Sequence, residues 1–421
     1  MEIQMQTNGH KTGFEPAVRE GTFYNDELPL KEEPHPDLIE LPIISYAQQT
    51  REIQAPELIS FLPDFEVMDR YSIEALERKV SDAASRIRLP EARRIFLDNL
   101  RDFKERGLPQ SEYTGTLESV LRILQADDGA VDAGSRKLAA LGAMANAAHP
   151  ESIAQGRHGT CSVAALEHKV FVQSPARAAA MIEQAVLLGK YQSSDGMTIE
   201  IPEESMAPGL RERKNFPPMP DGERNYASQL FQVTALNEVG QHFKPPMRYL
   251  QYPNPQYVDG EDDLEADFWL LANGSRRPFE APGRGVFSQT GGLTSYALAA
   301  LTYRLTGETN GVILNRQYDT DDAPATGHNL RDVRSSEEFE KAIAELKRQN
   351  KLPAIISVYG DGVKHLDKSD SPGGKTPNHF VTVDDYRPAM GGKPAQVLVH
   401  NNWKERHNGW MQTRKCFEAL T

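Results

Sequence analysis

Hydrophobic residues recur every three or four positions after residue 70, which is the spacing of one face of an α-helix. In residues 71–88 this face consists of Ile73, Leu76, Val80, Ala83 and Ile87. A second helical segment begins at Pro90 and stops at Gly107, residues that favour a helix start and a helix end. Residues 117–124 and 138–148 continue the pattern. Four short amphipathic helices in succession predict a small bundle or a helical layer.

Strand-like segments dominate the last third of the chain. Ser335 and Glu338 form a capping-box pattern, which predicts a helix whose apolar face is Phe339, Ile343 and Leu346. Three strand candidates follow at residues 353–359, 379–386 and 396–400. A helix followed by a run of adjacent strands indicates an α+β fold and not a repeat of βαβ units.

Two stretches lack a clear periodicity. Residues 1–60 combine prolines with an excess of acidic side chains, which predicts an extended or disordered N-terminal segment. Residues 190–290 contain proline-rich and turn-rich sequences and the acidic run 259–267. That run lacks the alternating spacing and the glycine of a calcium loop, so a solvated loop is the better interpretation.

Composition narrows the range of partners. The chain has 421 residues with 47 basic and 60 acidic side chains, which gives a net charge of −13. A surface this acidic repels phosphate backbones and anionic lipid heads, so we expect no nucleic-acid partner. No uncharged apolar run approaches the ~20 residues of a membrane-spanning helix, and no basic start precedes an apolar stretch at the N-terminus. We therefore expect no membrane insertion, and either cytoplasmic residence or export without a cleaved signal peptide.

Motifs for metals and nucleotides are also missing from the sequence. The two cysteines, Cys161 and Cys416, belong to no Cys-x-x-Cys pair with zinc spacing. No glycine-rich phosphate loop ends in Gly-Lys-Ser/Thr. We therefore expect neither a metal nor a cofactor. So few cysteines also fit a reducing compartment better than a disulfide framework.

Cys161 lies in the sequence QGRHGTCSVAALEHKVFV, where Gly156 and Gly159 predict a flexible turn and Ser162 onward predicts a helix. A cysteine at a helix start faces unpaired backbone amides and the positive end of the helix dipole, both of which favour thiolate over thiol. Gln155 could bring its side-chain NH₂ beside the sulfur, as a donor for the oxyanion formed in acyl transfer. Taken alone, Cys161 is better explained as a small buried residue that begins a core helix.

A histidine and two asparagines stand at the ends of the expected strands. His379 opens a strand and could accept the thiol proton with one ring nitrogen, while the other nitrogen needs a partner that fixes its orientation. Asn401 and Asn402 follow the strand 396–400, and an asparagine carbonyl oxygen can accept that N–H. The neighbouring Trp403 could shield this bond from water. Each residue taken alone is explained as a strand end or a turn.

Together the three segments resemble the papain family of cysteine peptidases in order, spacing and local pattern. The family's Gln-Gly-x-x-Gly-x-Cys segment is matched by residues 155–161, and its Asn-Ser-Trp segment by residues 401–403, followed by Asn-Gly at 408–409. Its histidine strand is similar to His379, Val381, Val383 and Tyr386, with Asp385 where glycine is usual. The chain departs from the family at Ser162, in place of a bulky aromatic, and at His158, in place of a disulfide-forming cysteine.

The resemblance implies an α+β, papain-like two-lobed cysteine peptidase domain at residues 151–421. A helical accessory region at residues 61–150 would precede it. Because Cys161 and His379 lie much farther apart in sequence than in compact family members, a large insertion is expected at about residues 190–300.

The resemblance also implies a role for each matched residue. Cys161 would be the nucleophile, His379 the proton shuttle and Asn401, not Asn402, the residue that orients the imidazole. Gln155 would line the oxyanion hole with the Cys161 amide, and Gly159 and Trp403 would lie on the substrate side. Asn402 occupies the family's serine position, so its replacement is expected to be nearly silent. His158 and His400 flank these segments and are weaker candidates for the base.

The implied function is thiol-dependent hydrolysis of an amide bond, in the first instance a peptide bond, through an acyl-enzyme. The expected partner is therefore a protein or peptide substrate. One alternative is a glutamine deamidase or a transglutaminase-like acyl transferase, because the Cys–His pair does not encode the acceptor. Another is a catalytically inactive papain-like binding protein, although the presence of all four expected site residues argues against it.

Overall fold

The computed structural model describes residues 73–156, 158–214, 216–253, 265–278, 293–308, 311–315, 330–359, 378–403 and 407–420. All of them belong to the compact unit Glu66–Thr421. The extended segment expected at residues 1–60 lies outside the described residues, as does most of the acidic run 259–267.

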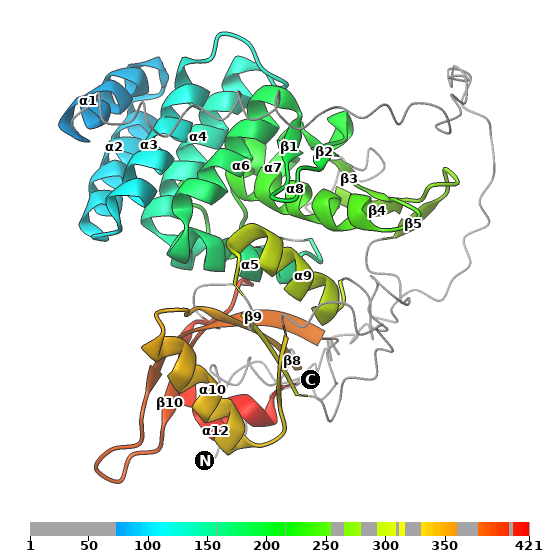
Figure 1. Ribbon diagram of the computed structural model, residues 1–421. Helices are drawn as coiled ribbons and strands as arrows, with labels where there is room; N and C mark the ends of the chain where they lie inside the picture. Colours follow the sequence, from blue (N-terminus) through cyan, green and yellow to red (C-terminus); the bar gives the residue numbers. More distant parts are fainter. Residues whose placement is uncertain are drawn as a thin grey trace, which may run out of the picture. The chain divides into compact units, whose positions relative to one another are not determined.

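The four helices predicted from the apolar spacing are confirmed, and they form the N-terminal part of a helical layer (Figure 1). They are α1 (Ile73–Ala83), α2 (Pro90–Glu105), α3 (Gln110–Gln125) and α4 (Ala133–Ala148). Pro90 is the first residue of α2, where its missing N–H costs no hydrogen bond. The side chain of Asp132 caps α4 by accepting hydrogen bonds from the amides of Gly134 and Ser135.

The helical layer continues beyond residue 150 without a break in its core. It includes α5 (Cys161–Gln173), α6 (Pro175–Leu188), α7 (Leu210–Lys214), α8 (Tyr226–His242) and α9 (Ser295–Thr306). One apolar cluster joins Leu117 and Met144 of the early helices to Val163 of α5 and Phe231 of α8. The boundary expected at residue 150 therefore does not separate two cores.

Helix α8 explains why the middle of the chain was hard to interpret. It lies within the expected insertion, yet it is buried from Tyr226 to Gly240, and only its last two residues reach partial exposure. A helix that is covered on every side has no polar stripe, so the helical periodicity disappears from its sequence. Residues 190–278 also contribute the hairpin β1 (Lys190–Gln192) and β2 (Thr198–Glu200), and the antiparallel strands β3 (Arg248–Pro253), β4 (Glu265–Leu270) and β5 (Arg276–Pro278).

Among the described residues, six strands form the largest sheet, in the order β11-β10-β9-β8-β6-β7. The three predicted strands are confirmed as β8 (Ala354–Tyr359), β9 (Asn378–Arg387) and β10 (Gln396–His400), and antiparallel pairing continues to β11 (Gly409–Gln412). Two short strands were not predicted, β6 (Val312–Asn315) and β7 (Leu330–Val333). Strand β6 runs parallel to both β7 and β8. The sheet is therefore mixed, and helix α10 (Ser336–Arg348) makes the crossover from β7 to β8.

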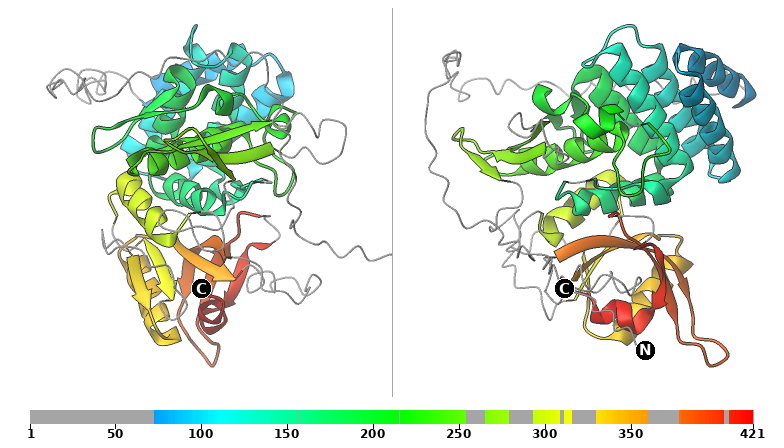
Figure 2. Two further views of the ribbon diagram at one scale, coloured as in Figure 1. Left: turned by 90° about the vertical axis from the view of Figure 1, so that its right-hand side faces the viewer. Right: turned by 180° about the vertical axis from the view of Figure 1, so that it is seen from behind.

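The sheet separates two apolar cores. Phe380 of β9 belongs to the core shared with the helical layer, whereas the next residue, Val381, belongs to a second core with Phe339 of α10 and Cys416 of α12 (Thr413–Glu418). Adjacent strand residues face opposite sides of a sheet, so β9 serves both cores. Figures 1 and 2 show α5 and α9 between the other helices and the sheet, and α5 packs against β9.

The structure is thus of mixed α and β type with a helical N-terminal region. Helix α10 begins where the capping pattern predicts, because the Ser335 side chain accepts the Glu338 amide, while the Glu338 carboxylate accepts the amide of Arg334 and not that of Ser335. No helix in the described part of the chain is both long and apolar enough to cross a membrane.

Candidate active site

Cys161 is the first residue of α5 and is partly exposed to solvent. The turn that precedes it requires a glycine at position 156, which has a φ of +67°, and an added Cβ there would lie 3.1 Å from the Cβ of Arg224. Thr160 occupies the N-cap position but does not cap the helix, because its hydroxyl donates to Gln232 of α8 at 2.7 Å. No side chain therefore caps the start of α5 at this position.

Three consecutive ionisable residues, all buried, anchor α5 in different directions. Glu167 accepts hydrogen bonds from Asn146 of α4 and Gln232 of α8, each at 2.9 Å. Lys169 donates to the carbonyl of Pro353 at 2.6 Å and pairs with Glu308 at 2.9 Å. Burial raises the pKa of Glu167 to about 7 and lowers that of Lys169. The helix that carries Cys161 is thus fixed to both neighbouring helices and to the chain entering β8.

His168 makes the third anchor, a buried ion pair with Asp384 of β9. Its Nε2 donates to Asp384 at 2.8 Å, and its Nδ1 donates to the carbonyl of Pro150 at 2.8 Å. Burial alone would lower the pKa of His168, but the carboxylate of Asp384 outweighs it and raises that pKa. Burial alone would raise the pKa of Asp384, but His168 outweighs it and lowers that pKa. With both ring nitrogens donating, His168 is an imidazolium.

A bulge in β9 aims Asp384 at this partner. Leu398 pairs with Asp385 and Val399 with Val383, so Asp384 has no counterpart in β10. An extra residue of this kind bends the strand and redirects a side chain. The ring of His400 stacks on His168 with centroids 4.0 Å apart, and its Nε2 donates to the carbonyl of Glu151. Burial and the His168 charge lower the pKa of His400 to about 3, so its ring is neutral.

His379 and Asn401 form a hydrogen bond of 2.9 Å between Nε2 and Oδ1. The same Oδ1 accepts the backbone N–H of Trp403 at 3.1 Å. Because a backbone amide only donates, the Asn401 atom that it meets must be the oxygen, and His379 Nε2 must therefore carry a proton. In the neutral ring, Nδ1 is then the nitrogen that accepts a proton.

The surroundings of this hydrogen bond protect it from water. His379 and Asn401 are each 1% exposed. The indole of Trp403 stacks on the His379 ring with centroids 3.8 Å apart and 25° between the planes. The backbone amide of Asn401 is itself held by the side chain of Asn408 at 2.7 Å. Hydrogen bonds in such a low-dielectric setting are stronger than in water.

Asn402 joins the remaining segments to this pair. Its carbonyl accepts the backbone amide of Gln155 at 2.9 Å. Its side-chain Nδ2 donates to the carbonyl of Cys161 at 2.9 Å and to the carbonyl of Phe380 at 3.0 Å. The structure thus brings together segments that are more than 200 residues apart in sequence, those of Gln155 and Cys161 with those of His379 and Asn401.

The other residues expected near the site fall into two groups. Gln155 is buried in the loop before α5, where its Nε2 donates to the carbonyl of His158 at 2.7 Å, and Gly159 lies half-buried in the same loop. The two alternative bases have partners elsewhere. His158 lies against Asp267 at 3.0 Å and against Gln251, and His400 belongs to the His168 cluster.

Sequence reasoning missed His168 and the bridging role of Asn402. The sequence does contain a signal for His168. It follows Cys161 by seven residues, so the two lie on the same face of the predicted helix. If that face is buried, a histidine on it needs a polar partner. The partner of His168 is Asp384, which lies within the predicted strand 379–386. No sequence pattern identifies the bulge that directs it.

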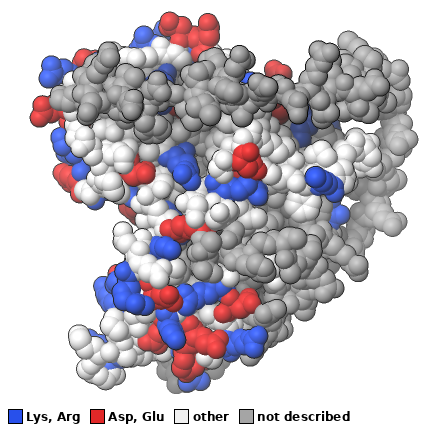
Figure 3. All heavy atoms as spheres, viewed as in Figure 1, with Lys and Arg blue, Asp and Glu red and all other residues white. Residues whose placement is uncertain are grey.

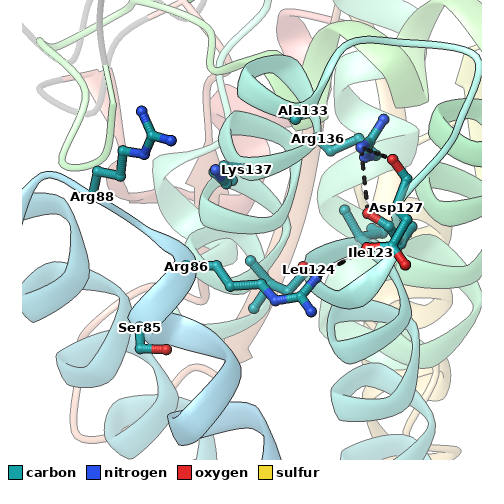
Figure 4. A pocket seen from close by; sticks show the side chains of 10 residues that line it. Ser85, Arg86, Arg88, Ile123, Leu124, Asp127, Ala133, Arg136 and Lys137 are labelled. Carbon is teal, nitrogen blue, oxygen red and sulfur yellow. Dashed lines mark hydrogen bonds and ion pairs between the residues drawn. The ribbon is translucent and has the colours of Figure 1, made fainter.

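One basic hollow of the described surface has in part a structural explanation. A hollow of about 380 Å³ beside α3 includes Arg86, Arg88, Arg136 and Lys137 (Figure 4). Arg86 donates to the carbonyls of Leu124 and Gln125, and Arg136 to those of Ala126 and Asp127, so these two guanidinium groups satisfy the C-terminal end of α3. On the face shown in Figure 3, basic and acidic side chains are interspersed. No group of three His, Cys, Asp or Glu side chains suited to a metal occurs among the described residues.

Comparison of the chain with protein-family models, with curated proteins and with solved structures found no match.

Proposed function

We propose that the protein is a thiol-dependent hydrolase of amide bonds, in the first instance peptide bonds, with a papain-like site and fold. Cys161 acts as the nucleophile, His379 as the proton shuttle, Asn401 as the residue that orients the imidazole, and Gln155 as an oxyanion donor. The substrate is a protein or peptide, held near Gly159 and Trp403. The sequence resemblance and the contacts among these residues support the proposal independently of each other.

The chemistry follows from the proton positions. His379 holds a proton on Nε2 for Asn401, so Nδ1 takes the proton of the Cys161 thiol, and the thiolate attacks the carbonyl carbon. The resulting oxyanion accepts hydrogen bonds from the backbone amide of Cys161 and from the Gln155 side chain. Gln155 Nε2 uses its second N–H for this bond, because its first N–H donates to the carbonyl of His158. The imidazolium then protonates the leaving amine, the C–N bond breaks and the acyl-enzyme forms. Water, deprotonated by His379, hydrolyses the thioester and regenerates the thiol.

The observation that carries the proposal is the Asn401 oxygen that accepts both His379 Nε2–H and the amide of Trp403. A structural histidine at a strand end needs no such fixed tautomer. Here the tautomer leaves Nδ1 for proton transfer, at a histidine linked through Asn402 to the first residue of α5. A base of fixed orientation near a cysteine at a helix start is the arrangement that thiol acyl transfer requires.

The test is the reactivity of Cys161 relative to Cys416, measured by mass spectrometry after brief treatment with iodoacetamide at pH 6. Cys416 provides an internal control, because it is 1% exposed and burial raises its pKa to about 12. We expect Cys161 to be alkylated rapidly and Cys416 to remain unmodified. His379→Ala should abolish the reactivity of Cys161 at pH 6, because the imidazolium partner is lost. A Cys161 that reacts at pH 6 no faster than an ordinary thiol, of pKa ~8.5, would contradict the proposal.

The reaction type is tested with a mixture of tryptic peptides as substrate. Hydrolysis of peptide bonds produces new amino termini that depend on Cys161. Cys161-dependent release of ammonia without new termini would instead assign deamidation of glutamine side chains. Reactive Cys161 with neither product in a broad peptide mixture would contradict peptide hydrolysis.

A further inference from the structure

Asn402 lies at the point where the segments of the proposed site meet. It follows the end of β10, is 1% exposed, and contacts the loop before α5, the start of α5 and the start of β9. By its resemblance to the papain family, Asn402 occupies the position of a serine and has no expected role in the site. The structure gives it three hydrogen bonds to three separate backbone segments.

The orientation of its amide is determined by its partners. Nδ2 lies 2.9 Å from the carbonyl oxygen of Cys161 and 3.0 Å from that of Phe380. Carbonyl oxygens only accept hydrogen bonds, so the group that faces them is the NH₂, and both of its hydrogens are used. A serine hydroxyl has one hydrogen and could donate to only one of the two carbonyls at a time. The bridge therefore depends on asparagine at this position.

One of the two bridged carbonyls belongs to the proposed catalytic pair, and the other belongs to the neighbour of its second member. One is that of Cys161 itself, and the other is that of Phe380, the residue directly after His379. We propose that Asn402 is a positioning residue that sets the separation of Cys161 and His379. This inference rests on the proposed function, and it replaces the expectation that Asn402 is dispensable.

The arrangement of α5 explains why the effect of Asn402 is local. The His168–Asp384 ion pair joins the same helix to the same strand, seven residues after Cys161, and Lys169 and Glu167 add further anchors. Loss of Asn402 therefore leaves α5 attached to β9 along its length. Only its first turn, which carries Cys161, loses its link through the Asn402 side chain to the carbonyl of Phe380 in β9.

The experiment measures the rate of Cys161 alkylation by iodoacetamide from pH 5 to pH 9 in Asn402→Ala and in the unmodified protein. Coulomb attraction between thiolate and imidazolium weakens by about a fifth if their separation grows from ~4 to ~5 Å. The titration of Cys161 should accordingly move upward by about 0.5–1 pH unit, and the rate should fall about 3- to 10-fold on the acid limb of the profile, where the thiol is mostly protonated. His379→Ala defines the limit of complete ion-pair loss.

Asn237→Ala serves as the matched control. Asn237 of α8 is also fully buried, and its Nδ2 also donates to two carbonyls, those of Val233 and Tyr249, both at 3.0 Å. Its replacement removes a similar set of hydrogen bonds away from the proposed site. We expect Asn237→Ala to lower the stability of the protein without moving the alkylation profile of Cys161. Asn402→Ser, with one donor, should lie between Asn402→Ala and the unmodified protein.

The outcomes separate this inference from the proposed function. If Cys161 of the unmodified protein titrates as an ordinary thiol, the proposed function and the inference both fail. If it reacts at low pH and the profile of folded Asn402→Ala is unchanged, the positioning role alone is overturned. Equal shifts in Asn402→Ala and Asn237→Ala would also overturn it, because the effect would then reflect general loosening. If Asn402→Ala does not fold, Asn402→Ser decides the matter by the same criterion.

Discussion

Asn401→Ala tests the most specific contact of the proposed site. The substitution removes the oxygen that accepts His379 Nε2–H at 2.9 Å and Trp403 N–H at 3.1 Å. During acyl transfer the imidazole becomes charged, so its hydrogen bond to Asn401 is a charge-assisted one, worth about 1.5–3 kcal/mol. At 1.36 kcal/mol per factor of ten, its loss corresponds to a decrease in kcat/KM of about 10- to 150-fold.

Asn401→Asp is the matched variant. The carboxylate keeps an acceptor oxygen for both donors, and no donor bond is lost, because Asn401 Nδ2 has no partner among the described residues. We expect it to recover most of the rate that Asn401→Ala loses. A carboxylate favours the imidazolium, so the alkaline limb of the pH profile should move to higher pH.

The assay is the pH dependence of kcat/KM from pH 5 to pH 9 for both variants, on a peptide shown to be cleaved. Circular dichroism and urea unfolding establish that each variant is folded. A folded Asn401→Ala with the kcat/KM of the unmodified protein would refute the orienting role. The orienting role would also be refuted if Asn401→Asp were no more active than Asn401→Ala, because the retained acceptor oxygen would then not contribute to the rate.

Three further predictions concern the same region. Gln155→Ala should lower kcat by about 10²–10³-fold with a smaller change in KM, because the Cys161 amide remains as a second oxyanion donor; a change confined to KM would contradict this role. Cys161→Ala and His379→Ala should each abolish turnover, and the double variant should lose no more than either alone, since the two act in one step; multiplying losses would show separate steps. Asp384→Asn should lower the free energy of unfolding by about 3–5 kcal/mol, measured by urea denaturation, because it breaks a buried ion pair. The folded pKa of Asp384 is lowered, so its contribution to the free energy of unfolding is lost as pH falls through that pKa. The folded pKa of His168 is raised, so its contribution is lost as pH rises through that pKa. The difference between Asp384→Asn and the unmodified protein should therefore be greatest at about pH 4.5–6.5 and shrink on either side; a difference that is constant from pH 4 to pH 9 would contradict the ion pair.

The sequence by itself determined the elements whose two faces differ. Helices α1 to α3 and α10 each keep one polar face in water, so their apolar residues recur at helical spacing and are visible without a structure. Strands β8 to β10 were visible for another reason, because each is a short run rich in apolar and β-branched residues that is bounded by turn residues. The hydrogen bond between His379 and Asn401 could also be predicted, because each residue lies in a short sequence pattern that resembles the papain family.

Only the tertiary structure decided how these elements combine. Helix α8 has no polar face, and β6 has too few residues to show a period, so neither was predicted. Because β6 pairs in parallel with β8, the sheet contains a parallel edge that the predicted strands did not indicate. The charges of Glu167, His168 and Lys169 resemble a solvated face in sequence, yet all three are buried, because their partners come from segments up to 216 residues away. For the same reason Asn402 looked dispensable. Local sequence records which side chain a position carries, whereas the two carbonyls that Asn402 bridges are brought within 3.0 Å of it by the packing of α5 against β9.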